Sequence, residues 1–188
     1  MQKHLAAVTI VLLMGMVLTR LYLLKRTGTK GMHFGSIDKK DFLIPPFAIF
    51  YFYTVFANAF NLPIVSKQSF FHSEIISWIG VLFCIIGIVL MFLSLVSFGK
   101  SFRVGIDVDK PDKLVTTGIF AFSRNPIYAA FAFVLPGQFF VFPNWILLVY
   151  LVTGYFLFHR QVLREEEFLK KHYGDEYTEY SKRVRRYI

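Results

Sequence analysis

The chain has 188 residues, 55% of them hydrophobic, with 23 Phe, a single Cys and a formal net charge of +9. A soluble domain of this length could not bury so much apolar surface, so residues 1–188 are predicted to form one domain of an integral membrane protein. One cysteine excludes a disulfide framework. The basic residues follow neither zinc-finger spacing nor alternation with aromatic residues, so they suit the anionic headgroups of a lipid bilayer rather than nucleic acid.

Apolar segments long enough to cross a bilayer recur along the whole chain. A transmembrane helix needs about 20 predominantly apolar residues. The last apolar stretch, residues 126–158, is too long for one span and is divided by Pro143-Asn144, so it is predicted to form a helical hairpin. We therefore expect an all-α integral membrane protein with five transmembrane helices, at residues 5–24, 42–62, 75–98, 126–142 and 145–158.

The predicted hairpin has a weak point in its first arm and a polar extension of its second arm. Pro136-Gly137 predicts a kink or local unwinding, and Gln138, which follows, is placed to satisfy freed backbone groups or to reach a ligand. From His159 the second arm continues as a polar helix that ends near Gly174. A short last helix is expected to follow, so the chain should close with C-terminal helices outside the membrane.

The distribution of charge predicts the orientation of the chain. Of the 21 Lys and Arg residues, 18 lie in three segments, residues 25–41, residues 99–125 and the tail from residue 159. Five spans place all three segments on one side, which the positive-inside rule assigns to the cytoplasm. The N-terminus is then outside and the C-terminus cytoplasmic. The chain is short and has no retention signal, which favours a prokaryotic plasma membrane over an endoplasmic reticulum.

A candidate ligand site lies where the predicted hairpin begins and ends. Asn125-Pro126 is typical of a helix start, with Asn as N-cap and Pro at the first helical position, and Arg124 precedes it. A helix start beside an arginine can hold an anion, although an ordinary junction with an interfacial arginine would look the same. Because paired helices of similar length bring their ends together, Arg124 and Asn125 should be spatial neighbours of Glu165 and Glu166.

S-adenosylmethionine fits such a site. Its carboxylate suits Arg or backbone N–H groups, its ammonium or ribose hydroxyls suit a Glu, and its sulfonium favours aromatic faces. A dinucleotide fits loosely, but no G-x-G-x-x-G follows a strand. No Ser/His/Asp or Cys/His nucleophile set is evident, and no metal site is expected because the five His residues are scattered.

Roughly residues 99–188 resemble the isoprenylcysteine carboxyl methyltransferase family, which belongs to a broader group of membrane methyltransferases that includes the phospholipid N-methyltransferases. The resemblance rests on LVTTGIFAFSRNPIY at 114–128, on Gly137-Gln138 in the hairpin, and on REEEFLKKHYGDEYTEYSKRV at 164–184. It implies S-adenosylmethionine as cofactor, a lipophilic methyl acceptor as partner, and a cofactor-binding part at 99–188. The implied cofactor-binding residues are Asp112, Lys113, Leu114, Val115, Phe120, Asn125, Pro126, Ile127, Tyr128, Gln138 and Glu165.

The chain departs from the family pattern at three positions. Asn125 stands where the family has histidine, and Phe120 stands where it has tyrosine. The arginine that the family links to substrate falls on Gln161 here, with Arg160 next to it. Arg160 and Gln161 are accordingly the candidate substrate-binding residues.

The resulting hypothesis is methyl transfer from a sulfonium to an O, N or S nucleophile of a lipophilic acceptor, such as a prenylcysteine carboxylate or a lipid headgroup. The candidate catalytic residues are Arg124, which would orient an anionic group, and Glu166, which is a second ligand or simply a solvated helix charge. Two alternatives stay open. One is an NADPH-dependent membrane reductase of the sterol-reductase type, and the other is a non-catalytic membrane protein that keeps the fold.

Overall fold

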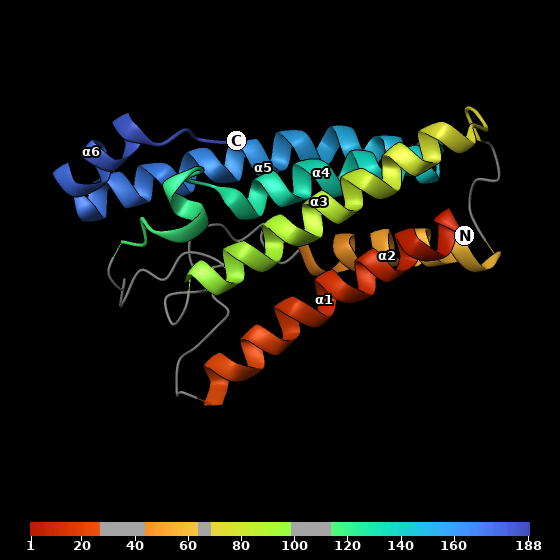
Figure 1. Cartoon of the computed structure of the whole chain (residues 1–188), viewed down its shortest axis with the longest axis horizontal. Helices are drawn as coiled ribbons and strands as arrows, with labels where there is room; N and C mark the ends of the chain where they lie inside the picture. The colour runs from red at the N-terminus through yellow and green to blue at the C-terminus, as the bar shows by residue number, and fades with distance from the viewer. Residues whose placement is uncertain (27–43, 64–68, 99–113) are drawn as a thin grey trace.

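The computed structural model describes residues 1–26, 44–63, 69–98 and 114–188, and these residues are largely helical. Within these ranges the one β pairing is an isolated bridge between Ser123 and Arg185. The elements in chain order are α1 (Gln2–Arg26), α2 (Ile44–Phe60), α3 (Glu74–Phe98), the 3-10 helix η3 (Gly118–Ala121), α4 (Pro126–Val141), α5 (Trp145–Tyr173) and α6 (Asp175–Arg183) (Figure 1).

Each predicted span coincides with a helix, and its ends agree to within three residues apart from the expected polar extension of α5. Three helices are long and apolar enough to cross a membrane, with candidate segments Gln2–Leu23, Glu74–Phe98 and Trp145–Tyr173 among the described residues. Helices α2 and α4 are apolar but have only 17 and 16 residues. The all-α membrane class is therefore confirmed, whereas the count of five spans stays a prediction.

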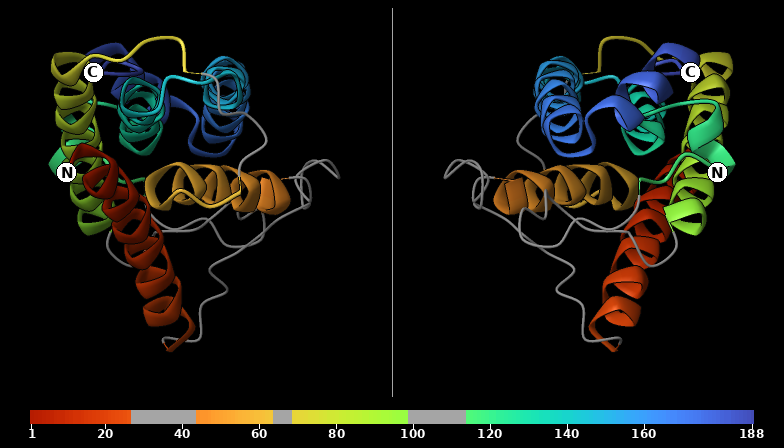
Figure 2. Two further views of the ribbon diagram at one scale, coloured as in Figure 1. Left: turned by 90° about the vertical axis from the view of Figure 1, so that its right-hand side faces the viewer. Right: turned by 90° about the vertical axis from the view of Figure 1, so that its left-hand side faces the viewer.

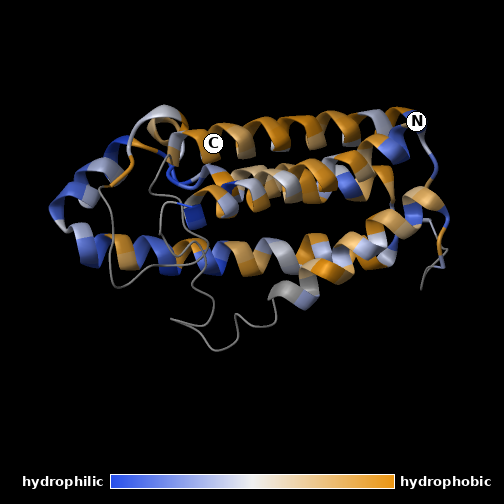
Figure 3. Cartoon of the chain, turned by 90° about the horizontal axis from the view of Figure 1, so that it is seen from below, coloured by the Kyte–Doolittle hydropathy of each residue, from blue (hydrophilic) through white to orange (hydrophobic). Residues whose placement is uncertain are grey.

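Helices α3, α4 and α5 lie side by side in one layer with α4 in the middle, and α1 and α2 lie on one side of it (Figure 2). The outward surfaces of the long helices carry many large apolar side chains, including exposed Leu82, Ile85 and Val89 on α3 and Val149 and Val152 on α5. Hydropathy colouring shows apolar residues along the helices and polar residues gathered at one end, where α6 and the last turns of α5 lie (Figure 3). Such a surface is suited to lipid.

The contact between α3 and α4 depends on three glycines, Gly80, Gly87 and Gly137, which we call the glycine interface. A Cβ atom on Gly80 would lie 2.6 Å from the carbonyl oxygen of Gly137, and one on Gly137 would lie 2.8 Å from the Cys84 Sγ. At Gly87 a Cβ would lie 2.8 Å from the Ala130 carbonyl oxygen. The two backbones therefore approach as closely as small residues allow, which is a common device in membrane helix pairs.

Helices α4 and α5 form the predicted hairpin. The turn is fixed by Asn144, whose side chain accepts a hydrogen bond from the Leu147 N–H at 3.0 Å at the start of α5. Helix α4 runs through Pro136 without interruption, so the chain does not unwind there, and a kink at Pro136 stays a prediction. The tight packing of Gly137 against α3 holds this part of α4 in place. The start of α4 and the polar part of α5 lie at the same end of the molecule as α6 (Figure 1).

Candidate functional site

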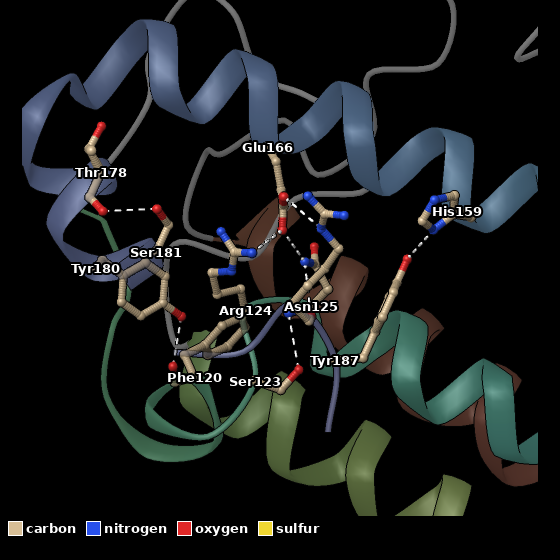
Figure 4. A network of polar contacts seen from close by, with 11 residues as sticks. Phe120, Ser123, Arg124, Asn125, His159, Glu166, Thr178, Tyr180, Ser181 and Tyr187 are labelled. Atoms are coloured by element: carbon tan, nitrogen blue, oxygen red, sulfur yellow. Dashed lines mark hydrogen bonds and ion pairs between the residues drawn. The ribbon is translucent and has the colours of Figure 1, made fainter. Parts of the chain in front are cut away.

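Asn125 joins the start of α4 to α5. It occupies the N-cap position with Pro126 at the first helical position, as predicted, but its side chain makes no capping hydrogen bond. Instead its Nδ2 donates to Glu166 Oε1 at 2.9 Å and to the carbonyl oxygen of Arg186 at 3.2 Å (Figure 4). Asn125 is buried, so these bonds satisfy its amide donors and help to hold the start of α4 against α5 and the tail.

Glu166 is the centre of an ion network at this junction. In addition to Asn125, its carboxylate contacts Arg124, with Nη2 at 3.4 Å from Oε1, and Arg186, whose Nε donates to Oε2 at 2.9 Å. The Glu166 side chain is only 9% exposed. Two guanidinium groups against one carboxylate leave the network with one surplus positive charge. The prediction that Arg124 and Asn125 lie beside the Glu165-Glu166 pair is thus confirmed at Glu166.

Glu165 has different surroundings from its neighbour. Its Oε1 accepts hydrogen bonds from the Tyr128 hydroxyl at 2.5 Å and from Gln161 Nε2 at 3.2 Å. Successive residues of an α-helix point about 100° apart, so the two adjacent carboxylates face different partners. Among the described residues, the hydrogen bonds to Glu165 come from neutral donors, and burial raises the pKa of its carboxyl. A cation bound beside it would favour the charged form. We call Arg124, Asn125, Tyr128, Glu165 and Glu166 together the hairpin junction.

The segment before α4 is fixed by a glycine and by α6. Gly118 has a φ of 64°, and a side chain there would collide with Ser97 of α3, whose Oγ accepts the Ile119 N–H at 3.2 Å. Two residues on, the Phe120 carbonyl accepts a hydrogen bond from the Tyr180 hydroxyl at 2.7 Å. The LV-x-x-G pattern therefore marks a turn that packs against the end of α3.

Two tyrosines of α6 are buried against this segment and the hairpin junction. Burial, and secondarily the negative charge of Glu166, raises the pKa of Tyr177 to about 12. Burial also raises the pKa of Tyr180, whose hydroxyl donates to Phe120. Both phenols therefore stay protonated at physiological pH and act as neutral groups, not as bases.

The predicted site residues are only partly brought together. Pro126 is buried and Ile127 half-buried in the first turn of α4, whereas Arg160 is exposed on α5. The ring of Phe120 packs edge-on against Phe98 with centroids 4.5 Å apart, so it serves the core of this segment. Leu114 and Val115 are half-buried ahead of η3, and Asp112 and Lys113 lie outside the described residues.

Gln138 is not part of the hairpin junction. Its position is 13 residues after Asn125 on α4, which is about 20 Å along a helix axis. Its Nε2 donates to the carbonyl oxygen of Ala6 at 2.8 Å, and its side chain is fully buried. The prediction that it reaches the cofactor site is therefore corrected, because the residue instead ties α4 to α1.

Residues after α6 also enter the site, although their sequence predicted only a basic tail. Arg186 contacts Glu166, and the Tyr187 hydroxyl lies 2.9 Å from His159 Nδ1 of α5. The signal that could have found them is the i, i+3, i+7 recurrence of Tyr177, Tyr180 and Val184, which indicates that α6 packs inward and directs the tail back to α4.

Fold and site together define an all-α membrane protein with a charged, hydrogen-bonded site at one end of a helical hairpin. The chain belongs to the phospholipid methyltransferase family, whose sequence profile matches residues 75–176. That range runs from α3 to the start of α6 and includes the whole hairpin junction. No grouping of three or more His, Cys, Asp or Glu side chains that could hold a metal is found within the described residues.

The chain is also similar to curated methyltransferases. It is 30% identical over 112 residues to a probable protein-S-isoprenylcysteine O-methyltransferase of Oryza sativa subsp. indica, a match that covers 58% of this chain and 59% of the relative. It is 31% identical over 115 residues to the protein-S-isoprenylcysteine O-methyltransferase of Rattus norvegicus, covering 58% of this chain and 40% of the relative. The chain thus spans about three fifths of the rice relative's length.

Proposed function

We propose that the chain is an S-adenosylmethionine-dependent methyltransferase of the membrane that transfers a methyl group to a lipophilic acceptor. The observation that carries this proposal is the hydrogen bond between Tyr128 and Glu165, which places a carboxyl whose hydrogen-bond donors in the described part of the chain are neutral beside the start of α4. Family membership and the names of the curated relatives support methyl transfer as the reaction class.

The proposed topology has five spans, the N-terminus outside and the hairpin junction on the cytoplasmic side. Helices α2 and α4 would cross with 17 and 16 residues if the bilayer thins locally or flanking residues reach the interface. The clustering of 18 of 21 basic residues on one side supports this arrangement. It gives a water-soluble donor access from the cytoplasm and a lipid acceptor access from the bilayer.

Glu165 is the residue that would hold the donor. The donor brings an ammonium group and a methyl-sulfonium, and the methyl carbon leaves its sulfur for the acceptor while the electron pair stays on sulfur. Within the described ranges the hydrogen-bond donors to Glu165 are neutral, so it suits a cationic partner better than Glu166, which already contacts two arginines. Tyr128 and Gln161 would fix the orientation of Glu165, which favours binding in one geometry.

Arg124 would orient an anionic group of the acceptor. Its side chain is only 12% exposed, and its Nε is buried with no hydrogen-bond partner among the described residues. With the surplus positive charge of the network, it suits a carboxylate or a phosphate. The curated relatives are named for prenylcysteine carboxyl methylation and the family for phospholipids, so a prenylcysteine carboxylate and a lipid headgroup are the two acceptor classes.

The test compares Glu165 with Glu167, two residues further along α5, in detergent-solubilised protein by calorimetry with S-adenosylmethionine. Glu165→Gln should weaken donor binding by about tenfold or more, because a charge-assisted contact contributes about 1.5–3 kcal/mol. Glu167→Gln is the matched control, since Glu167 is exposed on the same helix and the change removes the same charge. Its affinity should equal that of the wild type.

Two outcomes would contradict the proposal at different levels. Equal affinities for Glu165→Gln and the wild type would refute the role of Glu165 but leave the reaction class standing. Binding of NADPH by the wild-type protein, with no binding of S-adenosylmethionine, would refute the methyltransferase assignment and favour a reductase. Binding of neither would favour a non-catalytic membrane protein.

A further inference from the structure

The segment after α6, Val184–Ile188, returns to the hairpin junction and lies against the start of α4. The Arg124 N–H donates to the Arg185 carbonyl oxygen at 2.9 Å, next to the isolated bridge between Ser123 and Arg185. The next carbonyl, that of Arg186, accepts a hydrogen bond from Asn125 Nδ2 at 3.2 Å. This tail therefore follows the backbone that leads into α4 over consecutive residues.

Side chains fix the same tail to α5. The Arg186 guanidinium donates to Glu166 Oε2, the oxygen that neither Arg124 nor Asn125 uses. One residue later, the Tyr187 hydroxyl lies 2.9 Å from His159 Nδ1, two helical turns before Glu166 (Figure 4). Arg186 is thus held from both directions, by backbone contacts to the α4 side and by the Tyr187 contact to the α5 side.

The contact to Oε2 has a consequence for the rest of the hairpin junction. Oε1 of Glu166 already serves Asn125 and Arg124, so the orientation of the carboxylate determines where both groups lie. If Oε2 had no strong partner, the Glu166 carboxylate could rotate about the last bond of its side chain. Arg186 supplies that partner from outside residues 75–176, the part of the chain that the family profile matches.

We propose that Arg186 is a positioning residue of this site: it acts through Glu166 to fix Arg124 and Asn125, so that the C-terminal tail is part of the reaction centre. The proposal rests on the proposed function, because it assigns Arg186 an effect on methyl transfer. The proposal does not require Arg186 itself to contact the donor or the acceptor.

The first experiment measures steady-state methyl transfer to a prenylcysteine acceptor in detergent or lipid nanodiscs. Arg186→Ala should lower kcat by tenfold to a hundredfold, since small misplacements of orienting groups have effects of about this size. The KM for S-adenosylmethionine should change by less than about threefold, because Glu165 and its donors are untouched. Arg186→Lys keeps the positive charge but lacks the planar guanidinium group, so its kcat should lie between those of Arg186→Ala and the wild type.

Arg183→Ala is the matched control. Arg183 is exposed near the end of α6, and its side chain contacts only the Glu179 carbonyl of its own helix, at 3.3 Å, among the described residues. It removes the same charge from the same basic tail. Its kcat should equal that of the wild type, which separates a specific contact from a general loss of positive charge at the membrane surface.

The second experiment is a double-mutant cycle between Arg186→Ala and Glu166→Gln, followed by kcat and by thermal unfolding. If Arg186 acts through Glu166, its removal should have little further effect on kcat in the Glu166→Gln background. The Tm decreases of the two single variants, roughly 3–8 °C each, should likewise be non-additive. If Arg186→Ala does not fold, the same cycle is run with Arg186→Lys.

Equal kcat values for Arg186→Ala and Arg183→Ala, or full additivity with Glu166→Gln, would overturn the role of Arg186. A fall in kcat that Arg186→Lys does not relieve at all would also overturn it, in favour of a folding defect. Failure of the wild-type protein to bind S-adenosylmethionine would instead overturn the proposed function. The two failures are distinguishable because the second is seen without any variant.

Discussion

Helix α4 meets its two neighbours in contrasting ways. On its α3 side, the glycine interface brings backbone against backbone, with ideal Cβ positions 2.6–2.9 Å from the atoms opposite at Gly80. At its start, the hairpin junction consists of charged and hydrogen-bonded side chains, with hydrogen bonds between residues up to 41 apart in sequence. The first contact leaves no space to fill, and the second depends on the direction of individual donors and acceptors.

This contrast separates what holds the protein together from what it does. Close apolar packing along α3 and α4 stabilises the bundle, because small volume changes in such an interface have large effects. The hairpin junction sits at the polar end, where a lost bond disturbs geometry more than it disturbs the bundle. Variants of the glycine interface should therefore lose mainly stability, whereas variants of the hairpin junction should lose mainly ligand binding or turnover.

The largest expected effect is on the glycine interface. Gly80→Ala should destabilise the protein by about 2–3 kcal/mol, because the new methyl would overlap the Gly137 carbonyl and Phe140. The measurement is thermal unfolding of purified protein in detergent, where Tm should fall by roughly 4–10 °C. Gly15→Ala on α1 is the control, since nothing lies within 4 Å of its Cβ position. An unchanged Tm in Gly80→Ala would contradict the proposed difference between the glycine interface and the hairpin junction.

An intermediate effect is expected at Gly118, which links the end of α3 to the hairpin junction. Gly118→Ala combines a left-handed backbone, which disfavours Ala by about 1–2 kcal/mol, with a collision at Ser97. Gly174→Ala shares the positive φ but meets nothing within 4 Å. The backbone at Gly174, with a ψ of −122°, disfavours Ala at least as strongly, so a larger loss of unfolding free energy at Gly118 than at Gly174 is due to the Ser97 contact. A smaller loss at Gly118 would show that this contact is not restrictive.

The smallest stability effect is expected in the hydrogen bonds that surround the hairpin junction. Tyr180→Phe removes the donor to the Phe120 carbonyl and should cost about 1 kcal/mol in unfolding free energy. Because the ring remains, the packing of α6 is retained. If η3 supports the site, the free energy of S-adenosylmethionine binding, measured by calorimetry on the same sample, should change by more than the free energy of unfolding. A loss of stability larger than that of Gly80→Ala would reverse the ranking.

The helices could be predicted from sequence because the signals that define them are local. Runs of apolar residues, Asn125-Pro126 at a helix start and Gly174 at a helix end fixed α1 to α6 to within a few residues. The uninterrupted course of α4 through Pro136 could not be predicted in the same way. It depends on the packing of Gly137 against α3, which is a contact between segments 57 residues apart.

From the sequence, only those contacts of the candidate site that follow from the hairpin geometry could be predicted. That geometry brought Asn125 and Arg124 to Glu166, but it did not distinguish Glu165 from Glu166, which depends on the rotation of α5. Gln138 was misplaced because its neighbours in sequence suggested a functional break in the helix. Arg186 was missed because the return of the tail is specified by buried Tyr177 and Tyr180, whose partners lie on other elements.

The unbroken length of α5 sets the depth at which the site lies. Trp145 and Glu165 are 20 residues apart on one continuous helix, which is about 30 Å, close to the thickness of the hydrocarbon layer. In the proposed topology, with Trp145 at one membrane surface, Glu165 would lie close to the other. A rigid helix of this kind would set the depth of the reaction: a lipophilic acceptor anchored by its tail would present its head at the level of Glu165, without being lifted out of the bilayer. Selection by the position of the reactive head relative to the anchor would then require no pocket for the rest of the tail.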